Sequence, residues 1–85
     1  MKTFTYTIKD ELGIHARPAG MLAKTAKALD SEITIACREK SAAATKLMAL
    51  MGMGIKCGDT ITVTINGGDE TESEKAMQEF FKANL

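Results

Sequence analysis

The sequence is poor in the residues from which large binding surfaces are commonly built. It contains no tryptophan, one histidine, one proline and 5% aromatic residues, and its 11 basic residues balance its 11 acidic residues. Nucleic-acid binding normally needs a surplus of lysine and arginine on one face and, for single strands, aromatic platforms on which bases stack. A chain with zero formal net charge and so few aromatics is therefore not expected to bind nucleic acid.

The chain also lacks a long apolar run and any known cysteine motif. Residues 1–8 alternate polar and apolar side chains, so we expect no signal peptide and no insertion into a membrane. Cys37 and Cys57 match neither a CxxC redox pair nor a zinc pattern. Free thiols are typical of a reducing compartment. We expect a cytoplasmic protein without a metal or cofactor. The sequence contains no P-loop motif, so ATP binding through such a loop is not expected.

A chain of 85 residues is long enough to form one hydrophobic core but not two. No linker, internal repeat or low-complexity tract divides it, so we expect a single domain over residues 1–85. A domain of this size cannot enclose a large substrate cleft and also keep its core. Any chemistry is therefore expected to lie at the surface and to use few residues.

Hydrophobic periodicity predicts the secondary structure. Period-two alternation with many β-branched residues predicts half-buried strands at 3–8, 32–37 and 60–65, with a short strand at 39–43. Helical periodicity predicts helices at 16–29, 46–53 and 69–84. Strands with one covered face are typical of antiparallel sheets. The predicted fold is α+β: a four-stranded, mainly antiparallel sheet with three helices on one face, in the order β-α-β-β-α-β-α.

The segment Gly13-Ile14-His15-Ala16-Arg17-Pro18-Ala19 stands at a predicted strand-to-helix junction. Gly13 permits a tight turn, and Pro18 suits the first turn of a helix, where an amide has no intrahelical partner. His15 is thereby placed beside free amides and the positive end of the helix dipole, where an anion binds well. Arg17 adds a guanidinium suited to phosphate. A neutral imidazole here can act as a nucleophile toward an activated phosphoryl group, although a lone histidine at a helix end is often only a cap.

The other charged and apolar features are less specific. Asp10 and Glu11 are adjacent and are expected to border a solvated loop rather than to form an acid–base pair. The short helix at 46–53 is too small to bury all its apolar side chains. We expect Leu50 and Met53 to fill the core, and three other side chains to form an exposed, adaptable patch for docking partners. These three are Leu47, Met48 and Met51.

Over essentially its whole length the chain resembles the HPr family, the histidine-containing phosphocarriers of the bacterial phosphoenolpyruvate-dependent sugar phosphotransferase system. The segment 13–19 is similar to the active-site signature of that family, and Lys40-Ser41-Ala42, Met-Gly-x-Gly-Ile ending at Ile55 and Gly68-x-Glu70 look like further family segments. The resemblance implies the open-faced β-sandwich fold of the family.

The resemblance also implies residue roles and partners. His15 would accept a phosphoryl group on Nδ1 from phosphorylated Enzyme I and pass it to the IIA domain of a sugar permease. Arg17 would stabilise the transferring charge, assisted by the amides near Ala16 and Arg17. The partner-binding surface would include Gly20, Leu47, Met48 and Met51.

Two positions depart from the family pattern. Many members carry a phosphorylated regulatory serine at the start of the second helix, where this chain has Lys46. We therefore expect serine-type regulation to be absent, with Thr45 available as the N-cap of that helix; a substitute role for Thr45 or Ser41 stays open. Leu12 stands where many sugar-system members have a small polar residue, and it looks like the nitrogen-related, regulatory branch.

Three functions therefore remain in view. The first is a sugar-uptake phosphocarrier, which is a monomeric covalent intermediate in a relay rather than a turnover enzyme. The second is a regulatory carrier of a nitrogen-type or specialised branch that uses the same His15 chemistry. The third is a non-catalytic α/β interaction module in which His15 is only an N-terminal cap.

Overall fold

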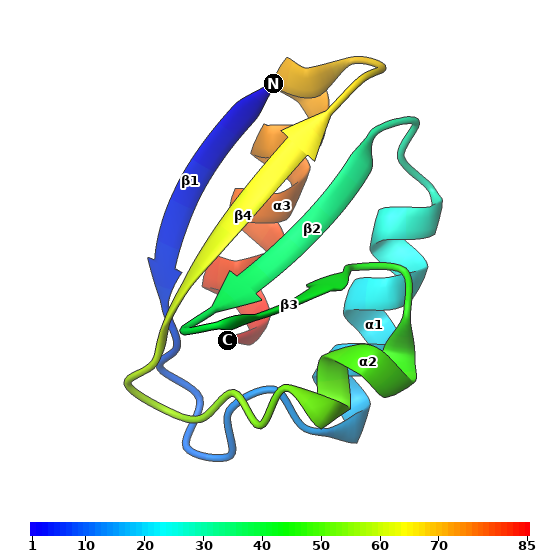
Figure 1. The fold of residues 1–85 in the computed structure, drawn as a ribbon. Coiled ribbons are helices and arrows are strands. Elements are labelled where there is room, and N and C mark those ends of the chain that lie inside the picture. The colour runs from blue at the N-terminus through cyan, green and yellow to red at the C-terminus, as the bar shows by residue number, and fades with distance from the viewer.

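The computed structural model describes residues 1–85 and contains the predicted four strands and three helices. The strands are β1 (Lys2–Thr7), β2 (Glu32–Cys37), β3 (Lys40–Ala43) and β4 (Thr60–Asn66). The helices are α1 (Ala16–Lys27), α2 (Leu47–Gly52) and α3 (Glu70–Asn84). Their order along the chain is β-α-β-β-α-β-α, as the sequence predicts (Figure 1).

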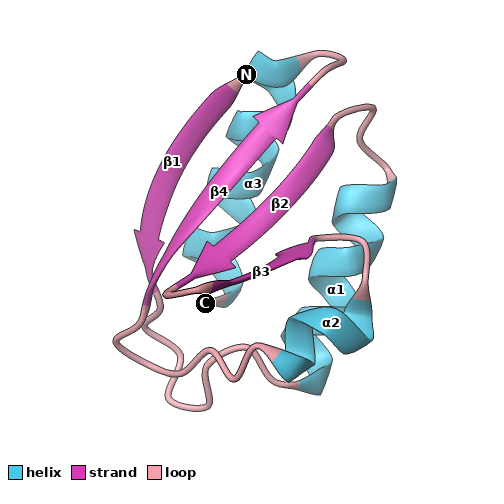
Figure 2. Ribbon diagram, viewed as in Figure 1, coloured by secondary structure: helices cyan, strands magenta, loops and turns pink.

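The four strands form one sheet in the order β1-β4-β2-β3, and every neighbouring pair is antiparallel (Figure 2). Val63 on the central strand β4 lies opposite Phe4 of β1 and Ile35 of β2. Because side chains alternate along a strand, this register places the apolar residues of all three strands on one face. The predicted antiparallel α+β architecture is confirmed.

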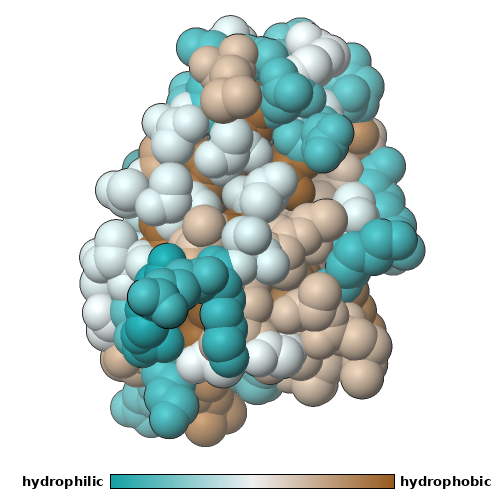
Figure 3. All heavy atoms as spheres, in the orientation of Figure 1, coloured by the Kyte–Doolittle hydropathy of each residue, from teal (hydrophilic) through white to brown (hydrophobic).

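One hydrophobic core lies between the sheet and the helices. The helix α1 contributes Leu22 and Ala26, and α3 contributes Met77 and Phe81, all of them buried. The opposite face of the sheet is rich in threonine and remains open, as the pale surface in front of the strands shows (Figure 3). None of the three helices combines the length and apolar character needed to cross a bilayer.

The helix α1 ends at Lys27, two residues before the predicted end. The amide of Ala28 donates to the carbonyls of both Lys24 and Thr25, and the amide of Leu29 donates to Ala26. The bonds to Thr25 and Ala26 reach the third residue back and tighten the last turn toward 3₁₀ geometry, which is common at helix ends. Leu29 still packs against the core from outside the helix.

The turn before α1 is pressed against the segment that follows α2. Gly13 has φ +66°, and a Cβ at this position would meet the carbonyl oxygen of Ile55 and would lie 2.6 Å from the Cα of Lys56. The next residue, Ile14, donates its amide to the same Ile55 carbonyl at 3.1 Å. Gly13 is therefore required both for its backbone conformation and for the close approach of two loops.

Asp59 anchors the loop on which Gly13 rests. One of its carboxylate oxygens accepts the amide of Lys56 at 2.9 Å, and the other forms an ion pair with Arg38 at 2.6 Å. The hydrogen bond from the Lys56 amide, followed by the charge and hydrogen bond of Arg38, lowers the pKa of Asp59 below its ordinary value of 3.8. The ionised carboxylate therefore ties the turn after β2 to the loop that precedes β4.

Replacement of Gly13 by alanine should destabilise the fold more than replacement of Gly54. Both glycines have φ +66°, but a Cβ at Gly54 meets no atom within 4 Å. We expect Gly54→Ala to lower the free energy of unfolding by about 1–2 kcal/mol, the cost of the left-handed backbone. Gly13→Ala adds the clash with backbone and should cost about 3 kcal/mol or more. Urea unfolding measures both values, and equal losses would contradict the close-approach argument.

The Asp59 anchor predicts a pH-dependent contribution to stability. Because the pKa of Asp59 is lower in the folded state, its stabilising effect is complete above the unfolded-state value and is lost as the pH falls through the folded-state value. Asp59→Asn should therefore lower the urea midpoint at pH 7 and should differ little from the wild type near pH 2. Glu39→Gln, at an exposed neighbouring position outside the ion pairs, is the control. A deficit in Asp59→Asn that is the same at both pH values would refute the assignment.

Candidate functional site

His15 occupies the N-cap position of α1 without using its side chain as a cap. Its backbone is extended, with φ −97° and ψ −173°, and the carbonyl of His15 accepts the amide of Ala19 at 2.9 Å. The partly buried imidazole makes no capping hydrogen bond and no other hydrogen bond within the chain. Both ring nitrogens are therefore available to a reactant, which counts against the interpretation of His15 as only a cap.

The first turn of α1 leaves two amides beside the imidazole. The amide of His15 donates to Gly13 at 3.2 Å, and Pro18 has no N–H to donate. The amides of Ala16 and Arg17 have no intrahelical acceptor, because they stand before the fourth residue of the helix. They add to the positive end of the helix dipole, which favours an anion at this end.

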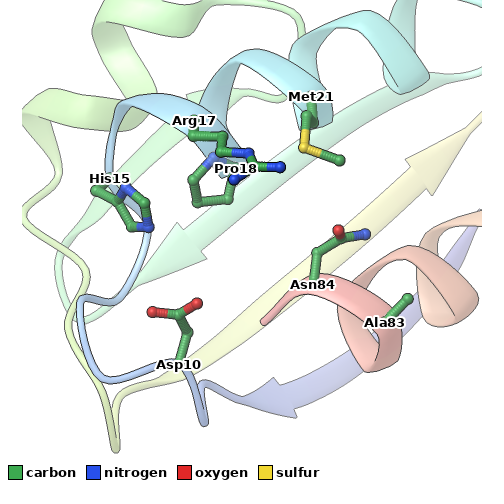
Figure 4. Close-up of a pocket in the computed structure, with 7 residues that line it drawn as sticks. All are labelled: Asp10, His15, Arg17, Pro18, Met21, Ala83 and Asn84. Carbon is green, nitrogen blue, oxygen red and sulfur yellow. The ribbon is translucent and has the colours of Figure 1, made fainter.

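A surface hollow of about 240 Å³ lies between the start of α1 and the end of α3 (Figure 4). It brings His15 and Arg17 together, as the sequence predicts, and its lining mixes polar and apolar side chains. Its full lining is Asp10, His15, Arg17, Pro18, Met21, Ala83 and Asn84. Its dimensions suit a phosphoryl group rather than a large substrate.

Charges of both signs face this hollow. Arg17 is exposed and belongs to neither of the two ion pairs of the structure. Asp10 was expected only to border a solvated loop, but its partly buried side chain lines the hollow. No group of three or more histidine, cysteine or acidic side chains is placed to hold a metal ion.

Sequence reasoning missed the wall of the hollow that comes from the end of α3. Ala83 and Asn84 reach the site because the amide of Asp10 donates to the main-chain oxygen of Leu85 at 2.9 Å, which ties the loop after β1 to the end of the chain. No sequence motif marks this contact. Met21 could have been found, since residues three to four apart share a helix face and Met21 lies four residues after Arg17.

The apolar surface predicted on α2 is exposed beside α1. Met48 is 78% exposed, and Leu47 and Met51 are each about 40% exposed. Leu50 and Met53 are buried, as predicted. In Figure 3 the exposed side chains give the tan region over α2.

Gly20 lies on α1 and is partly exposed, and a Cβ at this position would meet no atom within 4 Å. The helix α1 packs against α2, and Met21, the residue after Gly20, is exposed and lines the hollow. The predicted partner-binding surface and the hollow are therefore connected through α1.

The start of α2 differs from expectation at one residue. Lys46, not Thr45, is the N-cap of this helix, and no side chain makes a capping hydrogen bond there. The prediction that Thr45 caps α2 is wrong, because the amide of Lys46 closes a turn onto the carbonyl of Ala43 at 3.0 Å and places Thr45 inside that turn. Lys46 itself is exposed.

The fold and the site together define a class of protein: a small open-faced β-sandwich that presents a free histidine at the start of a helix. The family model described as PTS HPr component phosphorylation site matches residues 2–83. The chain therefore belongs to the HPr family of the phosphotransferase system, and the resemblance seen in its motifs is confirmed.

Individual relatives agree with this assignment. The chain is 39% identical over 79 residues to the phosphocarrier protein HPr of Mycoplasma capricolum, covering 93% of this chain and 89% of that protein. A crystal structure of an HPr from Thermoanaerobacter tengcongensis superposes with a TM-score of 0.91 at 32% identity, covering 98% of this chain and 93% of the other. A structure described as an HPr dimer from the same organism gives 0.76 at 32% identity, covering 98% and 95%.

Proposed function

We propose that this protein carries a phosphoryl group on His15 from phosphorylated Enzyme I to the IIA domains of sugar permeases. The observation that supports this most strongly is the unbonded imidazole at the start of α1, in a hollow shared with Arg17. A phosphoryl group on the ring would meet the positive end of the helix and a guanidinium within the same small space.

The transfer step conserves charge and atoms. The lone pair of Nδ1 attacks the phosphorus of the donor, a new N–P bond forms, and the bond between phosphorus and the donor breaks with its electrons returning to the donor. Arg17 and the amides of Ala16 and Arg17 stabilise the oxygens of the group in transit. Reversal of the same step on an acceptor frees His15, so the protein is a covalent carrier and not a turnover enzyme.

The docking of both partners is assigned to the exposed surface made of Gly20, Leu47, Met48 and Met51. Methionine side chains are flexible and polarisable, so one such surface can fit several partners. The hollow and this surface lie on a single chain, so a monomer is sufficient for the proposed cycle. Two free cysteines suit a cytoplasmic protein. Lys46 carries no hydroxyl group, so we propose that no phosphoserine forms at this position.

A regulatory, nitrogen-type carrier is the second candidate, and Leu12 is the observation that favours it. This side chain is 71% exposed in the loop before His15 and is apolar. We propose that an acceptor docking over the hollow contacts this side chain. The two candidates share the chemistry of His15 and differ only in the acceptor.

The central prediction is phosphorylation of His15. The intact protein, incubated with phosphoenolpyruvate, Mg²⁺ and Enzyme I, should gain the mass of one phosphoryl group that is labile in acid, as a phosphoramidate is. His15→Ala should gain none, and Arg17→Gln should be phosphorylated about 10²-fold more slowly, a typical loss when one charge-stabilising donor is removed. Intact-mass spectrometry over time measures both.

Failure of the wild type to gain this mass with a competent Enzyme I would refute both carrier functions and favour the interaction module. Transfer of the phosphoryl group to different IIA domains distinguishes the sugar-uptake carrier from the regulatory carrier. Faster loss of the label to a sugar-type IIA domain than to a nitrogen-type IIA domain supports sugar uptake, and the reverse order supports the regulatory branch.

The docking surface gives a second prediction. Met48→Glu places a charge in the centre of the exposed apolar surface and should raise the KM of Enzyme I for the carrier about tenfold or more, because a buried unpaired charge is costly at an interface. Thr71→Glu adds the same charge at an exposed position in the first turn of α3, a helix that begins at the opposite end of the molecule from α2 (Figure 1), and is the matched control. Equal KM values for both variants would remove α2 from the docking surface.

A further inference from the structure

We propose that the carboxylate of Asp10 sets the phosphoryl-transfer equilibrium of His15 by repelling the phosphoryl group that His15 carries. The inference rests on the proposed function and concerns the energy of the phosphorylated state rather than the identity of the partners. Asp10 does not touch the attacking nitrogen. Its effect is exerted through space, across the hollow.

The position of Asp10 is fixed by three hydrogen bonds. Its Oδ1 accepts the amide of Leu12 at 2.9 Å, its own amide donates to the main-chain oxygen of Leu85 at 2.9 Å, and its carbonyl accepts the amide of Gly13 at 3.0 Å. Because both the backbone and the carboxylate of Asp10 are hydrogen-bonded, these bonds must break before the side chain can rotate into solvent. The negative charge therefore stays at the hollow during the reaction.

The carboxylate of Asp10 also belongs to no ion pair. The two ion pairs of the structure join Arg38 to Asp59 and the N-terminal amine to Glu70, so neither involves Asp10 or Arg17. The carboxylate points from the loop below toward the side of the hollow where the imidazole of His15 lies (Figure 4). Its partial burial reduces the screening that water would otherwise provide.

A phosphoryl group on His15 would bring close to two further negative charges into this hollow. Arg17 and the start of α1 attract that group, whereas Asp10 repels it. The repulsion raises the free energy of the phosphorylated carrier and leaves the free carrier almost unaffected. The carrier then binds its cargo less firmly and gives it up more readily to an acceptor.

Asp10 has a second, structural role that the experiment must separate from its charge. Its Oδ1 closes the turn at Leu12, and this turn leads to Gly13 and His15. Asparagine keeps a carbonyl oxygen in the same place and removes only the charge. Serine keeps an acceptor for the Leu12 amide with a shorter, neutral side chain.

The test measures an equilibrium. Wild type, Asp10→Asn and Asp10→Ser are each brought to equilibrium with catalytic Enzyme I at fixed ratios of phosphoenolpyruvate to pyruvate, and the phosphorylated fraction is read by intact mass. Because a catalyst does not alter an equilibrium constant, changes in docking do not affect the result. Glu11→Gln, which removes an adjacent exposed charge that does not line the hollow, is the control.

We expect both Asp10 variants to favour the phosphorylated carrier by about three- to tenfold, the size of an interaction between partly hydrated charges that face one small hollow. Glu11→Gln should match the wild type, and 1 M salt should reduce the difference between wild type and Asp10→Asn. An unchanged equilibrium in folded Asp10→Asn or Asp10→Ser overturns the proposal, as does the failure of both variants to fold, which would assign Asp10 to the turn alone. A wild type that takes up no phosphoryl group would overturn the proposed function and this inference together.

Discussion

The close approach of Gly13 to the backbone at Ile55 and Lys56 is the constraint on which the site depends. It holds the turn before α1 against the segment after α2, so the histidine and the apolar surface of α2 are fixed relative to each other. A side chain at residue 13 would separate the two loops. Asp59 holds the same loop through its bond to the Lys56 amide and its ion pair with Arg38. The reactive group thus sits on a surface loop that is held by the backbone hydrogen bonds of Leu12, Gly13 and Ile14.

The chemistry of a carrier requires moderate rather than maximal stabilisation of the cargo. The helix dipole contributes about 0.3–1 kcal/mol toward an anion at an exposed site. Each 1.4 kcal/mol changes an equilibrium tenfold, so a strongly attractive site would trap the phosphoryl group on His15. A hollow with one cation, one anion and two free amides is a balanced environment for reversible transfer. The zero net charge of the whole chain does not reveal this arrangement, because the relevant charges are those of the few residues that line the hollow.

Local sequence patterns predicted the fold because each strand and helix carries its own periodicity. Threonine at every second position identified β1 and β4 as strands. Among the apolar residues in and just after α2, Leu50 and Met53 were correctly expected to be buried. Contacts between distant segments could not be predicted in this way. The approach of Asn84 to Asp10 depends on how the end of α3 meets the loop after β1, and the N-cap at Lys46 depends on a turn closed by Ala43. The first is set by tertiary packing and the second by a local turn, and neither leaves a periodic trace in the sequence.

Under the proposed function, the donor and the acceptor compete for one surface. The hollow and the exposed part of α2 adjoin across α1, and the open threonine face of the sheet is visible beside the α2 surface in Figure 3. A transient interface covers roughly 600 Å² on each partner, about an eighth of the 4935 Å² surface of this chain. Two partners that must each reach His15 cannot both occupy that area. The proposed transfer therefore requires release of the donor before the acceptor binds, and weak docking follows from the position of the site.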